Sequence, residues 1–98
     1  MCGATKDGLS VEGIDVTKEA VVQGVVVHGE SPVGGAYVRL LDAGGEFTAE
    51  VPTSASGHFR FFAAPGSWTL RVLAPGTDTV DRPVVARQGV VAEVEIAI

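Results

Sequence analysis

The sequence has little of several features on which common functional classes depend. Its 98 residues include one cysteine, Cys2, which cannot form an internal disulfide and fits a reducing compartment. The 7 basic residues are outnumbered by 12 acidic ones and no two of them are adjacent, whereas nucleic acids and anionic membranes bind clustered lysine and arginine. No apolar run approaches the ~18 residues of a membrane span. We therefore expect neither a nucleic acid nor a membrane as partner.

The start of the chain is also poor in structural signals. It has neither the basic start nor the apolar stretch of a secretory signal, so we expect a cytoplasmic protein. Residues 1–19 are polar, contain glycine and show no clear periodicity, which predicts a flexible N-terminal arm. Within this arm, residues 11–16 would become ordered if they added to a sheet edge. Residues 20–98 are expected to form one β-sandwich domain.

Glycine and valine are abundant, and apolar and polar residues alternate along short stretches bounded by turn residues. Alternation with period two is typical of half-buried β-strands. Strands are predicted at residues 20–28, 36–42, 46–53, 58–62, 67–74, 79–85 and 90–98. Pro83 marks one of them as an edge strand or a bulge, because proline cannot donate a ladder hydrogen bond. The spacing, with no helical segment, predicts an all-β fold, a seven-stranded antiparallel β-sandwich.

The alternation also predicts which side chains are buried. Those expected in the core are Val22, Gly24, Val26, Ala36, Val38, Leu40, Phe59, Phe61, Trp68, Leu70, Ala92, Val94, Ile96 and Ile98. Residues 63–66, which include Pro65 and Gly66, predict a tight turn that joins two strands as a hairpin. Counted outward from that turn, the expected cross-strand pairs are Phe61 with Trp68, Phe59 with Leu70, Arg60 with Thr69 and His58 with Arg71.

Several segments carry a family resemblance. Residues 22–26 (VQGVV), 32–40 (PVGGAYVRL), 56–61 (SGHFRF) and 65–70 (PGSWTL) resemble the carboxypeptidase regulatory-like, or transthyretin-like, domains. In those domains such segments form successive strands and turns of a small sandwich. The resemblance covers residues 20–98 and implies the fold, but it implies no chemistry, because the shared residues are core and turn positions.

A closer resemblance is to a small family of uncharacterised bacterial proteins. It rests on the Met-Cys-Gly start and on residues 46–51 (EFTAEV) and 59–71 (FRFFAAPGSWTLR). Members of that family are encoded beside thiosulfate sulfurtransferases of the rhodanese type. The resemblance therefore implies a role in sulfur metabolism with a rhodanese as protein partner, and it establishes no reaction.

Cys2 is the candidate sulfur acceptor. Removal of Met1 would leave it N-terminal, with an α-amine of ordinary pKa ~7.7–8.0 beside a thiol of ordinary pKa ~8.5. A neighbouring ammonium favours the nucleophilic thiolate, and a thiolate can take the sulfane sulfur of a rhodanese persulfide. The alternative is that Cys2 is an exposed residue of a disordered tail without a role.

Arg39, Arg60 and Arg71 fall at outward positions of predicted strands and are candidates for binding a partner or an anion. If their strands are neighbours in one sheet, they form a cationic patch for carboxylates or for an oxyanion such as thiosulfate. Tyr37 and Phe62, also predicted outward, would add an apolar rim. The alternatives are that each arginine pairs with an acid such as Glu50 or Asp42, and that the arm buries Phe62.

No catalytic or metal-binding pattern is present. His28 and His58, the only histidines, have no ligand at metal-binding spacing, so neither a metal site nor a cofactor is expected. Transthyretin-like hydrolases carry a C-terminal signature that this chain lacks. Related iron-dependent ring-cleaving sandwiches use two tyrosines and two histidines, whereas the chain has a single tyrosine. We therefore expect that this protein is not an enzyme.

Two functions remain. The resemblance favours a non-catalytic accessory protein of sulfur metabolism that docks on a rhodanese-type sulfurtransferase, with Cys2 as the candidate acceptor. The alternative is a generic β-sandwich module that binds or scaffolds proteins without sulfur chemistry. The sequence does not indicate an oligomeric state.

Overall fold

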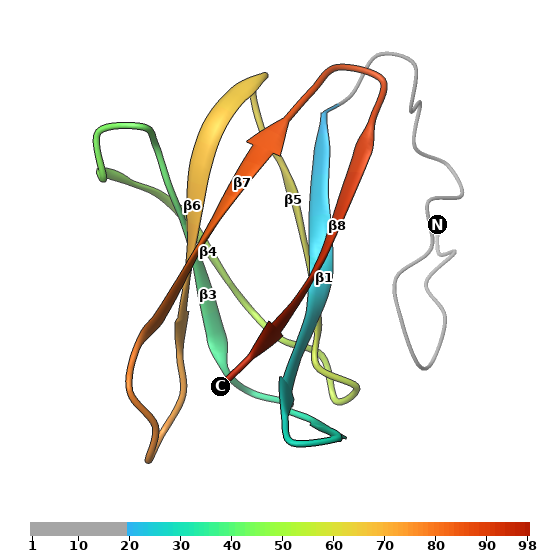
Figure 1. The fold of residues 1–98 in the computed structure, drawn as a ribbon, viewed down its shortest axis with the longest axis vertical. Helices are drawn as coiled ribbons and strands as arrows, with labels where there is room; N and C mark the ends of the chain where they lie inside the picture. The colour runs from blue at the N-terminus through green and yellow to red at the C-terminus, as the bar shows by residue number, and fades with distance from the viewer. Residues whose placement is uncertain (1–19) are drawn as a thin grey trace.

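Within residues 20–98, the alternating segments form eight strands and no helix (Figure 1). A computed structural model describes residues 20–98. Its strands are β1 Val21–His28, β2 Ser31–Pro32, β3 Tyr37–Leu41, β4 Phe47–Pro52, β5 His58–Phe62, β6 Gly66–Leu73, β7 Val80–Ala86 and β8 Val91–Ala97. The predicted strands are confirmed within one or two residues at each end, and β2 is an additional short strand. The predicted arm, residues 1–19, lies outside the described residues.

The first sheet, sheet A, is built around β1. Strand β5 pairs antiparallel with one edge of β1, from Val21 opposite Phe62 to Val25 opposite His58, and β2 continues along that edge. Strand β8 pairs with the other edge of β1 over seven residues, and this pairing is parallel. The sandwich is therefore confirmed, but one of its pairings is not antiparallel. Strand β8 follows all the strands of sheet B in the chain and runs beside β1 in the same direction (Figure 1).

The second sheet, sheet B, has the strand order β4-β3-β6-β7 and is antiparallel throughout. Strand β3 pairs with β4 and β6, and the register of the β3–β4 pair shifts between Leu40 and Leu41. Strand β7, which contains Pro83, lies at the edge of the sheet, as predicted from that proline.

The predicted hairpin of β5 and β6 is wrong. Strand β5 belongs to sheet A and β6 to sheet B, so residues 63–65 cross between the sheets. The Ala63 N–H donates to the Ala20 carbonyl (2.9 Å), and Trp68 Nε1 donates to the Ala64 carbonyl (2.8 Å), which fixes the crossing. Gly66 has a φ of 143°, a value that favours glycine and lets the chain turn into β6. None of the four predicted cross-strand pairs forms.

The core lies between the two sheets, and the predicted buried faces are confirmed. Its buried cluster is Ala20, Val22, Val26, Ala36, Val38, Leu40, Phe59, Phe61, Leu70, Val72, Val84, Ala86 and Ile96. Trp68, Ala92, Val94 and Ile98 are partly buried and pack against this cluster. Both Phe59 and Leu70 therefore reach the core, although they come from opposite sheets rather than from paired strands.

One polar side chain, Thr53, is buried together with these apolar residues. Its hydroxyl donates to the Val33 carbonyl (2.7 Å) and accepts a hydrogen bond from the Ala36 N–H (3.0 Å). A buried hydroxyl without partners would be destabilising, so these two bonds explain how Thr53 is accommodated. They also attach the loop before β3 to the end of β4.

Candidate functional site

A row of four charged side chains crosses the outer face of sheet B, one from each strand. Arg39 of β3 is the register partner of Glu50 on β4 and of Arg71 on β6, and Arg71 is the register partner of Asp81 on β7. The order across the sheet is therefore acid, arginine, arginine, acid. We call these four residues, Glu50, Arg39, Arg71 and Asp81, the arginine ladder.

Each arginine of the ladder is held by its own acid. Arg39 Nε donates to Glu50 Oε2 (2.7 Å), whereas Arg71 holds Asp81 with two parallel hydrogen bonds from Nε and Nη2 (2.8 and 3.0 Å). The hydrogen bond from Arg71 lowers the pKa of Asp81 below its ordinary value, and the same bond raises the pKa of Arg71. The alternative that the arginines pair with acids is thus confirmed for Arg39 and Arg71. Asp42, the other acid considered, instead accepts from the N–H groups of Gly44 and Glu46 in a turn.

Exposed aromatic residues border the ladder. Tyr37, two residues before Arg39 on β3, is 50% exposed, and Phe47 on β4 is 60% exposed. The Arg39 guanidinium lies over the Phe47 ring at 5.8 Å from its centroid, a cation–π contact that covers part of the ring. The exposure of Tyr37 confirms the prediction that its side chain points outward. The sequence reasoning missed Phe47, which the predicted strand at residues 46–53 contains but to which no face was assigned.

Arg60 and Phe62 do not belong to this surface. Both lie on β5, which is in sheet A, so the three predicted arginines do not form one patch. The reason is the crossing at residues 63–65, which separates β5 from β6. Arg60 Nε donates to Gln23 Oε1 (3.0 Å) on the neighbouring strand β1. Phe62 points outward as predicted and is 58% exposed.

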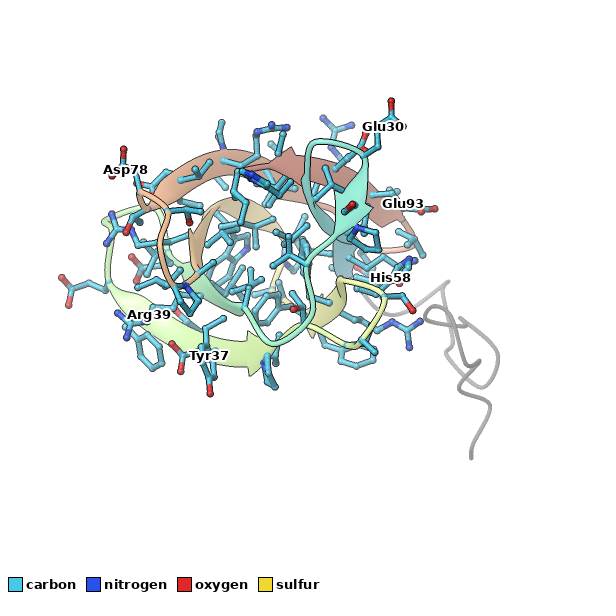
Figure 2. The ribbon with its side chains drawn as sticks, turned by 90° about the horizontal axis from the view of Figure 1, so that it is seen from below. Glu30, Tyr37, Arg39, His58, Asp78 and Glu93 are labelled. Atoms are coloured by element: carbon cyan, nitrogen blue, oxygen red, sulfur yellow. The ribbon has the colours of Figure 1, made fainter. Side chains whose placement is uncertain are left out.

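The two histidines lie apart from the ladder. His28 Nδ1 is 2.8 Å from the Ile98 carbonyl oxygen, and His58 lies on the outer side of β5. Figure 2 shows His58 and Glu93 well separated from Tyr37 and Arg39. Within residues 20–98 no three His, Cys, Asp or Glu side chains are grouped closely enough to hold a metal ion. Cys2, the candidate sulfur acceptor, lies outside the described residues.

Comparison with known proteins assigns the family. The family described as "Protein of unknown function (DUF1416)" matches residues 2–98. The chain belongs to this family. A DUF1416 relative from Mycobacterium tuberculosis strain H37Rv, uncharacterized protein Rv0814c, is 56% identical over 87 residues, which cover 85% of this chain and 87% of that protein. The resemblance to a family of uncharacterised bacterial proteins is thus confirmed.

Solved structures with low sequence identity share the fold of this DUF1416 protein. The Bacillus anthracis TIE protein is similar with a TM-score of 0.72 and 14% identity, over 82% of this chain and 17% of that protein. The dioxygenase domain of a dioxygenase–carbohydrate-binding protein fusion from Streptomyces sp. SirexAA-E is similar with a TM-score of 0.66 and 13% identity, over 94% of this chain and 86% of that domain. At these identities the likeness concerns the β-sandwich alone. No helix long and apolar enough to cross a membrane occurs among residues 20–98.

Proposed function

We propose that this DUF1416 protein is a non-catalytic accessory protein of sulfur metabolism that docks on a rhodanese-type thiosulfate sulfurtransferase. The observation that carries the docking is the arginine ladder with exposed Tyr37 and Phe47 beside it. Arginine and aromatic residues are the types that most often dominate binding energy in protein interfaces. The link to sulfur rests on the resemblance to a family encoded beside such enzymes. The cytoplasm, where thiols stay reduced, is the compartment in which we place this function.

The ladder offers specific groups to a partner. The hydrogen bond to Glu50 engages Nε of Arg39, and the terminal amino groups of Arg39 make no hydrogen bond within residues 20–98. Such N–H groups suit a carboxylate of the partner, which an arginine can bind with two parallel bonds. The ring of Tyr37 supplies apolar area next to this polar contact. The ladder therefore fits a surface of the sulfurtransferase on which an acidic side chain lies beside an apolar patch.

The sulfur chemistry of the proposal belongs to Cys2. The Cys2 thiolate attacks the outer sulfur of the partner's cysteine persulfide, and a new sulfur–sulfur bond forms on Cys2. The sulfur–sulfur bond of the partner breaks, and its cysteine leaves as a thiolate, so that no oxidant or reductant is consumed. The β-sandwich contributes docking only. In the alternative function, the same surface binds another protein and Cys2 plays no part.

The docking is tested by titrating a purified rhodanese with the full-length protein in a calorimeter. Truncation of a binding hot spot costs about 2 kcal/mol or more, so Tyr37→Ala and Arg39→Ala should each weaken binding by roughly thirtyfold or more. Arg87→Ala is the matched control, because Arg87 is exposed in the turn between β7 and β8, away from the ladder. Wild-type protein that does not bind any rhodanese would contradict the proposal, as would equal weakening by all three variants.

The sulfur transfer is tested separately by intact mass. The protein is incubated with a rhodanese and thiosulfate, and its intact mass is measured before and after reduction. The mass should rise by one sulfur atom, and the gain should disappear on reduction and in Cys2→Ser. If the protein binds a sulfur-charged rhodanese but gains no such mass, the sulfur transfer is contradicted. The alternative function, a generic binding module without sulfur chemistry, would then hold.

A further inference from the structure

Strand β8 forms an outer edge of sheet A, and within residues 20–98 its side away from β1 is unpaired (Figure 1). The residues at the two ends of β8 show which way its backbone groups point. The Ile98 N–H donates to the Val27 carbonyl (2.8 Å), and the Val90 carbonyl accepts from the Val21 N–H (3.2 Å). Since alternate residues of a strand direct their N–H and C=O groups to opposite sides, the even-numbered residues of β8 face β1. The residues that direct these groups to the free edge are Val91, Glu93, Glu95 and Ala97.

The free edge of β8 lacks the features that usually prevent a further strand from adding to a sheet, namely proline, a bulge or a very short strand. The two edges of sheet B contain Pro52 in β4 and Pro83 in β7. In sheet A, β2 has two residues, and on the free side of β5 the His58 carbonyl already accepts from the Ser54 N–H (2.9 Å). Strand β8 has seven residues without proline or glycine and keeps one register with β1 throughout. It is therefore the longest uninterrupted edge among the described residues.

The side chains of β8 indicate which kind of strand this edge fits. On the outer face, Glu93 and Glu95 are exposed, and neither side chain makes a hydrogen bond or an ion pair within residues 20–98. On the inner face, Ala92 and Val94 pack against the core but stay partly exposed, because no strand lies beyond them. Side chains directly opposite each other on neighbouring strands interact. An added strand therefore fits this edge when basic residues lie opposite the two glutamates and apolar residues beside Ala92 and Val94.

The charges of β8 disfavour two other occupants of the edge. If β8 paired antiparallel with β8 of a second copy, Glu93 would lie opposite Glu95 twice. A register shifted in either direction would place one of these glutamates opposite its own copy. Like charges in such positions destabilise a sheet. Residues 11–16 of this chain, the other occupant, carry Glu12 and Asp15 and no basic residue. The two glutamates of β8 therefore select a basic strand of another protein.

We propose that the free edge of β8 binds an extended segment of a partner protein, in which basic residues alternate with apolar ones, as an added antiparallel strand of sheet A. In strand addition the backbone hydrogen bonds supply affinity and the alternate side chains supply specificity. Here the N–H and C=O groups of the odd-numbered residues supply the bonds, and Glu93 and Glu95 supply the preference for lysine or arginine. The antiparallel direction is the more stable one per residue. The site is separate from the arginine ladder, which lies on sheet B.

The site is tested with the full-length protein and a seven-residue peptide of alternating valine and lysine, blocked at both ends. When its lysines lie opposite Glu93 and Glu95 in an antiparallel pair, the lysine N–H groups point toward β8 and the valine N–H groups point away. Methylation of the lysine backbone nitrogens should therefore abolish binding. Methylation of the valine backbone nitrogens, the matched control, should leave binding nearly unchanged. Amide NMR spectra follow the titration, and the amides of Glu93 and Glu95 should become protected from hydrogen exchange when the peptide binds.

Isosteric variants show whether the glutamates set the preference. Glu93→Gln with Glu95→Gln should weaken binding of the lysine peptide at least tenfold, whereas Glu30→Gln should leave it unchanged, because Glu30 is an exposed acid in a turn.

Three results would overturn the proposal. The first is the absence of saturable shifts along β8 at millimolar peptide. The second is equal binding of the two methylated peptides, which would indicate attraction of charge alone, and the reverse order of the two would contradict the antiparallel register. The third is protection of the Glu93 and Glu95 amides before any peptide is added, because the edge would then already be occupied, by residues 11–16 or by a second copy.

Discussion

Arg39 and Arg71 are register partners at the centre of sheet B, so two positive charges lie directly opposite each other on adjacent strands. Like charges in this position destabilise a sheet. The flanking acids oppose that effect, since Glu50 binds Arg39 and Asp81 binds Arg71. The four residues therefore act as one electrostatic unit, in which the loss of either acid exposes the repulsion between the arginines.

We expect Glu50→Gln to lower the free energy of unfolding by about 0.2–1 kcal/mol, the range for a charged cross-strand pair. The loss should be smaller when Arg71→Gln is already present, because the opposing charge is gone. Urea denaturation of the two single variants and the double variant measures this coupling. Glu46→Gln, at an exposed acid outside the ladder, is the control. Losses that simply add would show that the arginines do not interact.

The Arg71–Asp81 pair predicts a pH dependence. The pKa of Asp81 lies below its ordinary value of 3.8 in the folded protein, so the folded state favours the ionised carboxylate. The stabilisation is therefore complete above pH 3.8 and is lost as the pH falls through the depressed folded value. We expect Asp81→Asn to be less stable than wild type at neutral pH and equally stable once wild-type Asp81 is protonated. Thermal unfolding from pH 7 to pH 2 tests this, and a difference that stays constant over the whole range would contradict it.

The strands and their buried faces could be predicted from the sequence because both depend on local alternation. Residues such as Phe59 and Phe61 are two apart on one strand, and any sandwich places both in its core. Strand partners depend on contacts between distant residues, and there the prediction failed. A hairpin of β5 and β6 and a crossing between sheets both direct Phe59 and Leu70 inward, so the buried pattern cannot distinguish them.

The same distinction between local alternation and strand partners applies to the candidate site. That Tyr37, Arg39 and Arg71 point outward could be predicted, since each alternates with a buried residue on its strand. Arg39 and Arg71 are neighbours, and Arg60 is not, because of the order of the strands in the two sheets. Local alternation in the sequence does not indicate that order. The partner Asp81 could not be predicted for the same reason, because it lies on β7, which pairs with β6 only in the folded sheet.

Thr53 is expected to be important for stability although it lies outside the candidate site. Thr53→Val keeps the shape of the side chain but removes the hydroxyl, which leaves the Ala36 N–H and the Val33 carbonyl without this partner in the folded protein. We expect the free energy of unfolding to fall by about 1–3 kcal/mol. Chemical denaturation measures it, with Thr48→Val on the exposed side of β4 as the control. Equal stability of the two variants would show that the hydroxyl contributes nothing.

Gly24 is expected to be the glycine least tolerant of substitution, because β1 and β8 approach closely there. A Cβ atom at this position would collide with the backbone carbonyl oxygen of Val94 and would lie 2.9 Å from Val94 Cγ2 and 3.0 Å from Phe59 Cζ. A backbone carbonyl cannot rotate away as a side chain can, so the parallel β1–β8 pair would have to separate. We expect Gly24→Ala to lower the free energy of unfolding by about 3 kcal/mol or more, the upper part of the range for overpacking.

The matched control for Gly24→Ala is Gly44→Ala, where the nearest atom to a new Cβ is Asp42 Oδ1 at 3.5 Å, an ordinary contact. Urea denaturation compares the two variants, and amide hydrogen exchange shows where Gly24→Ala acts. Protection should be lost first along β8, because that strand pairs with β1 alone in the part of the chain that the structure describes. A Gly24→Ala protein as stable as Gly44→Ala would mean that β8 does not lie in this register beside β1.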